Sequence, residues 1–320
     1  MFIEASAEYI PGRVVDNDYF SRLTGREPGW FEQRTGIRAR RRGAPDENTN
    51  TMSVAAVRRL ASEGERVLAD IDLIIAASYT PWDTIGTMAH VIQREFMLSG
   101  AKAIYISTAC SSFIDALDLA AAYLQSGRAK KALIVAAEHN SLYSSDEDEK
   151  SGHLWGDGAA AFVVREASAA EGVLEIIDTY AAGLADRGRG PDAISLRPQS
   201  DGLVMEHGKD IFAHACREMS AATRLVLARN QLGIQDLRLL VPHQANKRIV
   251  DSVAHDLGLS PDRIAMTIEE LGNTGCASVA ITLHRNKHLL APGEVAVLVT
   301  FGGGYSVGAA LVRRRETRMR

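Results

Sequence analysis

The 320-residue chain has few cysteines and no long apolar run, and each shortage excludes a class of protein. Cys110, Cys216 and Cys276 are widely spaced and form neither a disulfide framework nor a CxxC metal motif, so we expect reduced thiols and no metal. No apolar segment approaches the ~20 residues of a membrane helix. The first residues, MFIEASAEYIPGRVV, lack the regions of a signal peptide, which predicts a cytoplasmic protein without a membrane span.

The chain also lacks a large excess of either positive or negative charge. The 36 Lys and Arg residues oppose 40 Asp and Glu, for a formal net charge of -4, which gives no general attraction to nucleic acid or anionic membrane. Two basic runs, 38–42 and 313–320, lack the interleaved aromatic side chains that stack on bases, and we expect both to be solvated. We therefore expect small-molecule chemistry and no nucleic-acid partner.

Proline-rich linkers and low-complexity tracts are absent, and two stretches of the chain instead show the same order of elements. Each has a buried strand, a turn that leads into a helix, and two further strands. The expected strands are 71–78, 131–138 and 156–166 in the first stretch, and 237–244, 294–304 and 305–314 in the second. Continuous apolar strands that alternate with helices indicate an α/β fold with sheets covered on both faces.

Cys110 lies in YISTACSSFIDALDLAAAYL (105–124), between an apolar strand-like run and a helix rich in alanine and leucine. A helix N-terminus stabilises a thiolate and lowers the pKa of the thiol, which favours a nucleophile. Free cysteine is also commonly buried, so a core thiol explains the position equally well. The repeated order of elements would bring the loops at 107–112, 242–246 and 272–276 near a pseudo-twofold axis.

Two further motifs place polar side chains in those loops. LVPHQANKRIV (240–250) puts His243 at the end of a buried strand, as a candidate proton carrier or hydrogen-bond donor. ELGNTGCASVA (270–280) puts Asn273 in a turn before a helix, where its amide would donate to an oxyanion or cap the helix. Taken singly, each residue is better explained by a structural role than by catalysis.

Together these motifs resemble the β-ketoacyl-acyl carrier protein synthase III family, within the thiolase superfamily. The resemblance rests on TACSSF around Cys110, PHQAN around His243, GNTGCAS around Asn273 and the late stretch FGGGYSVGAALV. GWFEQRTGIRARR (29–41), GDGAAA and GKDIF (208–212) extend it over nearly the whole chain.

The resemblance implies a thiolase-like, five-layered αβαβα fold built from two pseudo-equivalent halves. Residues 1–166 would form the half with the nucleophile, and residues 167–320 the half with the histidine and the asparagine. It also implies a homodimer. The implied substrates are acyl-CoA and a malonyl group carried by acyl carrier protein (ACP), with no metal and no cofactor.

The resemblance assigns catalysis to Cys110, His243 and Asn273. Cys110 would take the acyl group as a thioester, and a malonyl thioester would then lose carbon dioxide. His243 and Asn273 would donate hydrogen bonds to the oxygen that becomes negative in that step. The backbone N–H groups of Cys110 and Gly303 would form the oxyanion hole.

The resemblance also implies substrate-binding roles for several residues. They are Trp30 and Arg34 at the nucleotide end of coenzyme A, Gly208, Ala245 and Asn246 along the pantetheine path, and Arg248 as a contact for the acidic carrier protein. Taken alone, Trp30 would be an ordinary anchoring aromatic.

Ile85 lies in YTPWDTIGTMAHVIQREF (79–96), which matches the family's loop that crosses the subunit interface. The resemblance places its side chain at the end of the partner's acyl pocket. Because isoleucine is smaller than an aromatic ring, it predicts room for primers longer than acetyl. The alternative is that Ile85 only packs the interface.

Three hypotheses on function remain open. The first is a synthase that condenses an acyl-CoA primer with malonyl-ACP, in fatty acid or in specialised polyketide or pigment biosynthesis. The second is an acyltransferase of the same fold that passes the acyl group to an oxygen, nitrogen or sulfur nucleophile and leaves malonate intact. The third is a non-catalytic subunit of a heterodimer. The presence of Asn273 favours the first, and the presence of all three catalytic residues disfavours the third.

Overall fold

Nine strands form one continuous mixed sheet in the computed structural model, which describes residues 1–64, 66–166 and 174–315. The strand order is β11-β12-β13-β8-β1-β7-β6-β4-β5. The bounds are β1 Phe2–Tyr9, β4 Leu73–Ala77, β5 Lys102–Ile106, β6 Lys131–His139, β7 Asp157–Arg165, β8 Leu174–Gly183, β11 Leu237–Pro242, β12 Val295–Gly302 and β13 Ser306–Arg314. The six strands expected from the apolar runs are all present.

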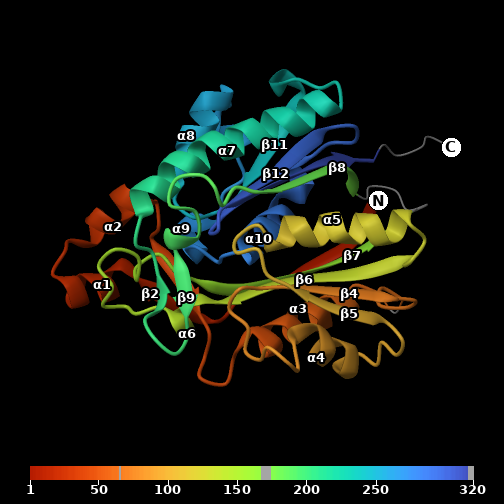
Figure 1. The fold of residues 1–320 in the computed structure, drawn as a ribbon, viewed down its shortest axis with the longest axis horizontal. Coiled ribbons are helices and arrows are strands. Elements are labelled where there is room, and N and C mark those ends of the chain that lie inside the picture. Colours follow the sequence, from red (N-terminus) through yellow and green to blue (C-terminus); the bar gives the residue numbers. More distant parts are fainter. Residues whose placement is uncertain (65, 167–173, 316–320) are drawn as a thin grey trace.

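The sheet has a narrow junction in its middle, where β1 meets β8. Among the described residues, two pairs join these strands, Phe2 with Glu175 and Ile3 with Leu174. The two parts of the sheet splay apart from this junction and form two separate layers with helices between them (Figure 1).

Helices fill the remaining three layers. Figure 1 shows α7 and α8 on one outer face, α5 and α10 between the two parts of the sheet, and α3 and α4 on the other outer face. The bounds are α1 Asn17–Thr24, α2 Pro28–Thr35, α3 Thr49–Ala61, α4 Met88–Glu95, α5 Ser112–Gln125, α6 Asn140–Tyr143, α7 Gly208–Arg229, α8 Lys247–Leu257, α9 Ile268–Leu271 and α10 Ala277–Asn286. The five-layered αβαβα fold is thereby confirmed.

The central helices pack closely on the strands because small residues face them. A Cβ atom at Gly308 of β13 would lie 2.8 Å from Cγ2 of Ile114 in α5, so only glycine permits this approach. Phe113 of α5 and Phe162 of β7 stack with ring centroids 5.1 Å apart, and both are fully buried. The layer of α5 and α10 is therefore the centre of the apolar core.

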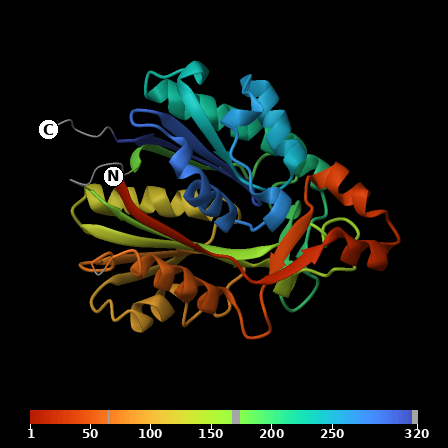
Figure 2. The ribbon, with the colours of Figure 1, turned by 180° about the vertical axis from the view of Figure 1, so that it is seen from behind.

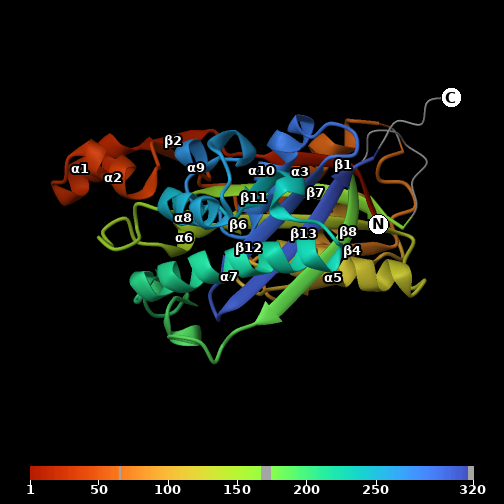
Figure 3. The ribbon, with the colours of Figure 1, turned by 90° about the horizontal axis from the view of Figure 1, so that it is seen from above.

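Smaller elements extend from one end of the layers. Helices α1 and α2 project at the end far from the N-terminus, next to the hairpin of β2 (Arg13–Asp16) and β3 (Ala39–Arg42) (Figures 2 and 3). A second hairpin joins β9 (Ser195–Arg197) to β10 (Gly202–Val204). Short 3-10 turns lie at Gly190–Asp192, Ile234–Asp236, Pro261–Arg263 and Lys287–Leu289.

The basic run 38–42 is only partly solvated: Arg38 is exposed as expected, but Arg40 and Arg42 are buried, contrary to our expectation. It contains β3, and the alternation of a strand turns Arg40 and Arg42 inward. Arg40 is fully buried, where its Nε donates to the carbonyl of His153 and its guanidinium lies over the ring of Phe20. Of the second run, residues 316–320 lie outside the described part of the chain.

The division into halves at residues 166 and 167 stays a prediction, because residues 167–173 lie outside the described ranges. Among the described residues, no helix combines the length and the apolar character needed to cross a membrane.

The carboxyl ends of the parallel strands position the loops of interest. β4 runs parallel to both β5 and β6, and β11 runs parallel to β12. Parallel strands place the loops that follow them at one edge of the sheet, where α/β proteins bind ligands. Cys110 follows β5 and His243 follows β11, so the fold brings both residues to such edges.

Gly156, directly before β7, packs against the loop that carries Asn273. A Cβ atom at Gly156 would lie 1.9 Å from the carbonyl oxygen of Leu271, a contact that no side chain allows. Gly156→Ala is therefore expected to lower the free energy of unfolding in urea by about 1–3 kcal/mol or more. The matched control is Gly183→Ala in β8, where no atom lies within 4 Å of the added methyl group. An equal loss of unfolding free energy in the two variants would contradict this interpretation.

Candidate active site

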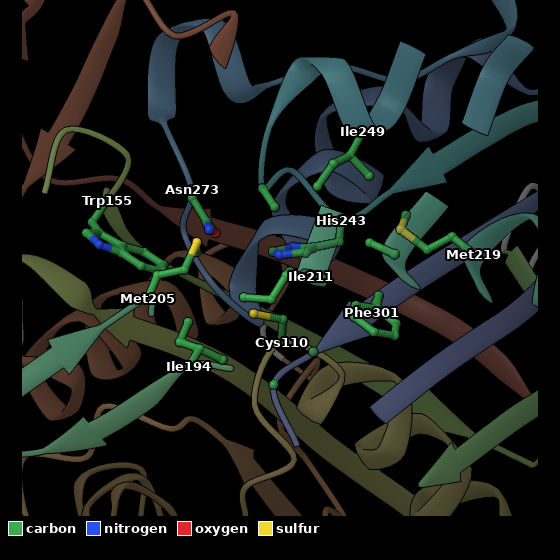
Figure 4. Close-up of a pocket in the computed structure, with 14 residues that line it drawn as sticks. Cys110, Trp155, Ile194, Met205, Ile211, Met219, His243, Ile249, Asn273 and Phe301 are labelled. Carbon is green, nitrogen blue, oxygen red and sulfur yellow. The ribbon is translucent and has the colours of Figure 1, made fainter. Parts of the chain in front are cut away.

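Cys110, His243 and Asn273 line one cavity of about 40 Å³. Figure 4 shows their side chains directed toward a common space, with Trp155, Ile194 and Met205 on one side and Phe301, Met219 and Ile249 on the other. All three polar residues are buried. The structure thus brings together the three residues that the sequence singled out from three separate loops.

Cys110 lies immediately before α5, whose N-cap is Ser111. The preceding Ala109 has a φ of 52°, a left-handed conformation that alanine rarely adopts, and this turns the chain sharply just before Cys110. The end of β12 approaches it closely, since a Cβ atom at Gly302 would lie 2.8 Å from the Cys110 backbone nitrogen. Gly303 also lines the cavity. The backbone around Gly302 and Gly303 therefore borders the thiol.

The surroundings of Cys110 do not favour its thiolate, contrary to the expectation from the helix N-terminus. Burial and the negative charge of Glu138 raise the pKa of Cys110 to about 12, while a hydrogen bond with Tyr79 acts in the opposite direction. The thiol is therefore protonated at neutral pH in the empty site.

Glu138 is a fully buried carboxylate in β6 that the sequence analysis passed over. It accepts hydrogen bonds from Ser78 Oγ (3.0 Å), from the backbone nitrogen and hydroxyl of Thr80, and from the nitrogen of Cys276 (3.4 Å). Burial nevertheless raises the pKa of Glu138 to about 7. One signal in the sequence could have found it, because it is the ionisable residue at the end of the apolar run ALIVAAE.

His243 is held by Ser278 of α10. The two groups lie 2.6 Å apart from Nδ1 to Oγ, which leaves Nε2 as the nitrogen that faces the cavity. The hydroxyl oxygen of Ser278 also accepts from the backbone nitrogen of Gln244. Burial lowers the pKa of His243 to about 4, so the imidazole is neutral at pH 7. A serine donating to Nδ1 selects the tautomer with a proton on Nε2, which is a hydrogen-bond donor.

Asn273 is oriented through its backbone and its side-chain oxygen. Its nitrogen donates to the carbonyl of Leu154 over 2.8 Å, and its carbonyl accepts from the nitrogen of Gly156 over 3.0 Å. Its Oδ1 accepts from the nitrogen of Gly275 over 2.9 Å. Because the oxygen is engaged in the turn, the Nδ2 donor is the part of the amide available to the cavity.

A second cavity of about 1020 Å³ lies toward the surface and shares Met205 with the inner cavity. Trp30, Arg34, Gly208, Asn246 and Arg248 line it, whereas Ala245 lines the inner cavity. Its cationic lining comprises Arg26, Arg34, Lys150, Arg189, Lys209 and Arg248. The pair of cavities therefore has the form of a wide, cationic mouth above a narrow apolar chamber with the thiol.

Trp30 is flanked by two guanidinium groups. The Cζ atoms of Arg26 and Arg34 lie 4.3 and 4.7 Å from the centroid of its ring. Glu149 holds Arg26 through an ion pair of 2.9 Å. Arg26 is a second residue that the sequence analysis missed. It lies four residues before Trp30, and a pair of residues at that spacing forms no recognisable motif.

Comparisons with known proteins agree with this geometry. A family model described as 3-Oxoacyl-[acyl-carrier-protein (ACP)] synthase III matches residues 105–181, and the model of its C-terminal part matches residues 227–314. A β-ketoacyl-acyl-carrier-protein synthase III of Rhodospirillum centenum is 33% identical over 314 residues, which cover 95% of this chain and 96% of that protein. The chain belongs to the β-ketoacyl-acyl carrier protein synthase III family of the thiolase superfamily.

Solved structures of the family superpose on nearly the whole chain. The 3-oxoacyl-acyl-carrier-protein synthase III from Aquifex aeolicus VF5 has a TM-score of 0.89 and 30% identity, and the match covers 98% of this chain and 99% of that chain. The priming β-ketosynthase from the R1128 polyketide biosynthetic pathway has a TM-score of 0.88 and 31% identity, with 98% and 96% covered.

Ile85 is the one predicted site residue that lies outside both cavities of the single chain. Its side chain is 87% exposed, and it lines neither the inner nor the outer cavity. Any role of this family loop in the acyl pocket must therefore come from contact with another chain.

The cysteines form no disulfide bond among themselves. Cys110, Cys216 and Cys276 are all free, as the spacing predicted. In residues 1–64, 66–166 and 174–315, no group of three or more His, Cys, Asp or Glu side chains is arranged to hold a metal ion.

The low pKa of His243 has a measurable effect on stability. An unfolded histidine protonates near pH 6.5 but folded His243 only near pH 4, so the unfolded state binds more protons between these values. Stability is therefore expected to fall as the pH drops from 6.5 toward 4. Urea unfolding between pH 4.5 and 7 should show a shallower pH dependence in His243→Gln than in the wild type. Identical dependences would mean that folded His243 titrates normally.

Proposed function

We propose that this protein is a β-ketoacyl-ACP synthase that loads an acyl group from coenzyme A onto Cys110 and condenses it with malonyl-ACP. The observation that carries the proposal is the convergence of a thiol, a neutral imidazole and an amide on one buried cavity that adjoins a wide cationic mouth. The relatives named above are synthases of this type, which supports the same assignment here.

The first half-reaction is thioester exchange. The Cys110 sulfur attacks the acyl carbonyl of the acyl-CoA, a carbon–sulfur bond forms to the enzyme, and the bond to coenzyme A breaks. Coenzyme A leaves as the thiol and carries away the proton that Cys110 has lost. The backbone N–H groups of Cys110 and Gly303 are proposed to hold the oxyanion, in keeping with the approach of the 302–303 backbone to the thiol.

The second half-reaction is a decarboxylative condensation. The malonyl thioester loses carbon dioxide, and negative charge develops on its thioester oxygen. The Nε2–H of neutral His243 and the Nδ2–H of Asn273 are proposed to donate to that oxygen. The resulting carbon nucleophile attacks the acyl-Cys110 carbonyl, and Cys110 is released as a β-ketoacyl-ACP forms. The residues of this chain supply all of these steps, so we propose no metal and no cofactor.

The mouth is proposed to bind the carrier of each acyl group. Trp30 and Arg34 would contact the nucleotide end of coenzyme A, while Gly208, Asn246 and Ala245 would border the pantetheine. The exposed Arg248 lies in the first turn of α8 beside the mouth, as a contact for an acidic carrier protein would require. These substrates and carriers are those of a cytoplasmic enzyme of fatty acid or specialised polyketide biosynthesis.

The alternative of a same-fold acyltransferase has less support. Transfer to an oxygen, nitrogen or sulfur nucleophile needs no donor pair at an enolate oxygen. Here Gly275 fixes the amide of Asn273 and Ser278 fixes the imidazole of His243, so both donors are preorganised. This preorganisation favours the condensing reaction.

Variants of the three polar residues should separate the two half-reactions. Cys110→Ala is expected to form no acyl adduct from acyl-CoA in intact-protein mass spectrometry, because the nucleophile is gone. His243→Ala and Asn273→Ala are expected to retain acyl loading but to release carbon dioxide from malonyl-ACP about 10² to 10³ times more slowly.

The matched control is Cys216→Ala, which removes the half-buried thiol of α7 outside both cavities and should keep the adduct. An adduct that persists in Cys110→Ala would reject Cys110 as the nucleophile. Undiminished carbon dioxide release in His243→Ala or Asn273→Ala would support the acyltransferase instead.

We also propose a homodimer, in keeping with the family resemblance. β5 is an outer strand of the nine-stranded sheet, and an unpaired sheet edge is a ready template for another chain. Trp82 and Ile85, in the loop that follows β4, are 57% and 87% exposed. Burial of these side chains by a second copy would explain why they are apolar.

Sedimentation equilibrium of the wild type is expected to give twice the mass of one chain. Ile85→Asp should shift the equilibrium toward monomers, since it would place a charge in the interface. Val14→Asp, at a 54% exposed position of β2, is the control that should leave the mass unchanged. A monomeric wild type would contradict both the proposed dimer and the proposed role of Ile85 in a partner's pocket.

A further inference from the structure

Glu138 is a buried ionisable group that the proposed mechanism does not use. It lies near the end of β6 and is fully buried. Burying a carboxylate costs free energy unless its oxygens accept hydrogen bonds or face a cation. In the part of the chain that the structure describes, no Lys, Arg or His side chain pairs with Glu138. Hydrogen bonds alone therefore stabilise its charge.

Both carboxylate oxygens accept from the loop 78–80, which follows β4. Oε2 accepts from the hydroxyl of Ser78 over 3.0 Å, and from the nitrogen (3.1 Å) and the hydroxyl of Thr80. Oε1 accepts from the nitrogen of Tyr79 over 3.3 Å. The Thr80 hydroxyl in turn accepts from the nitrogen of His139 over 2.9 Å, which fastens the loop to β6. The carboxylate of Glu138 is therefore held in one orientation.

The same carboxylate reaches the turn that carries Asn273. Oε1 also accepts from the nitrogen of Cys276, the N-cap of α10, over 3.4 Å. Gly275 packs on the stem of the side chain, since a Cβ atom there would lie 2.8 Å from Cγ of Glu138. The nitrogen of Gly275 donates to Oδ1 of Asn273 over 2.9 Å. Glu138 thus contacts two residues of this turn, and one of them orients the Asn273 amide.

An amide of the same shape cannot replace this carboxylate. The hydroxyls of Ser78 and Thr80 can reverse and accept, but the backbone nitrogens of Tyr79, Thr80 and Cys276 can only donate. The NH₂ group of Glu138→Gln would face either the Thr80 nitrogen or the other two nitrogens. Either orientation leaves at least one buried N–H without an acceptor, which costs free energy. The arrangement therefore requires an ionised carboxylate.

We propose that Glu138 is a positioning residue for the decarboxylation, whose ionised carboxylate ties the turn 273–276 to the loop 78–80 and so keeps the Nδ2–H of Asn273 directed at the enolate oxygen. The inference rests on the proposed condensation, in which Asn273 donates to that oxygen. Glu138 lines neither the inner nor the outer cavity, so it acts through Asn273 and not on the substrate. Because acyl loading does not use the Asn273 amide, Glu138 matters for the second half-reaction.

The first test is Glu138→Gln, with carbon dioxide release from malonyl-ACP measured on enzyme already acylated at Cys110. The kcat is expected to fall about tenfold with an unchanged KM, because the Asn273 donor is misdirected but not removed. The final amount of acyl adduct should equal that of the wild type. The matched control is Asp72→Asn, the same change at the other end of β4, where the carboxylate accepts from the nitrogens of Lys130 and Lys131. It should leave both half-reactions unchanged.

The double variant Glu138→Gln/Asn273→Ala tests whether Glu138 acts through Asn273. Two residues that act through one hydrogen bond do not have additive effects. The double variant is therefore expected to release carbon dioxide no more slowly than Asn273→Ala alone. A further tenfold loss in the double variant would show that Glu138 acts elsewhere and would overturn the inference.

The pH profile of the wild type tests the same role without a substitution, and it decides the matter if Glu138→Gln does not fold. Five titratable groups influence or surround Glu138: Tyr79, Tyr105, Tyr143, Cys110 and Cys276. Burial raises the pKa of each of them, so they stay neutral near pH 7. The imidazole of the next residue, His139, lies toward Asp157 instead. Burial raises the pKa of Glu138 to about 7, and its protonation converts one acceptor oxygen into a donor.

Carbon dioxide release by the acylated wild type is therefore expected to slow as the pH falls from about 8.5 to about 5.5, and Glu138→Gln should be slow throughout this range. A flat wild-type profile would overturn the inference, and so would a wild-type kcat in Glu138→Gln. Either result, with carbon dioxide still released, would leave the proposed condensation intact. A wild type that loads Cys110 but releases no carbon dioxide would overturn the condensation and this inference with it.

Discussion

The site depends on two backbone hydrogen bonds that join the segment before β7 to the segment before α10. Asn273 donates to Leu154 and accepts from Gly156, so one residue is bonded on both sides across a long separation in sequence. The amide of Asn140 bonds the same Asn273 carbonyl. Because Gly156 leaves no space for a side chain, the two segments can meet only at this distance. The position of the Asn273 amide in the cavity follows from this junction.

The electrostatics of the cavity favour neutral groups before substrate arrives. Burial keeps His243 uncharged and Cys110 protonated, and the nearby Glu138 adds to the effect on the thiol. A neutral imidazole suits a donor to an enolate better than an imidazolium would, since no proton is then transferred to the carbon nucleophile's oxygen. The same low polarity strengthens each hydrogen bond once a charged intermediate forms. The site therefore combines a thiol that is costly to ionise with strong donors for the later step.

The sequence predicted the parts of this architecture that repeat or that carry motifs. Apolar runs bounded by turns located β4, β6, β7, β11, β12 and β13, because strands buried on both faces leave little room for polar residues. Family motifs located Cys110, His243 and Asn273. The prediction that Arg40 is solvated was wrong. It rested on charge alone, whereas strand alternation turns the side chain inward and the ring of Phe20 covers it. Ser278 and Glu138 were missed because their importance lies in partners that are distant in sequence.

Chain-length specificity is the property that a motif conveys least well, because a pocket is bounded by all of its walls at once. Ile85 would belong to a wall that a second chain supplies, and the small size of its side chain was the only basis for predicting room in the acyl pocket. Tyr79 lies six residues earlier in the same loop, where the sequence shows only an ordinary aromatic after a strand. Its position depends on the glycine at 275 and on the amide of Asn140, which come from other parts of the chain. Ile85 is 87% exposed and lines neither cavity of the single chain, so the size of its side chain can bear on an acyl pocket only through contact with a second copy.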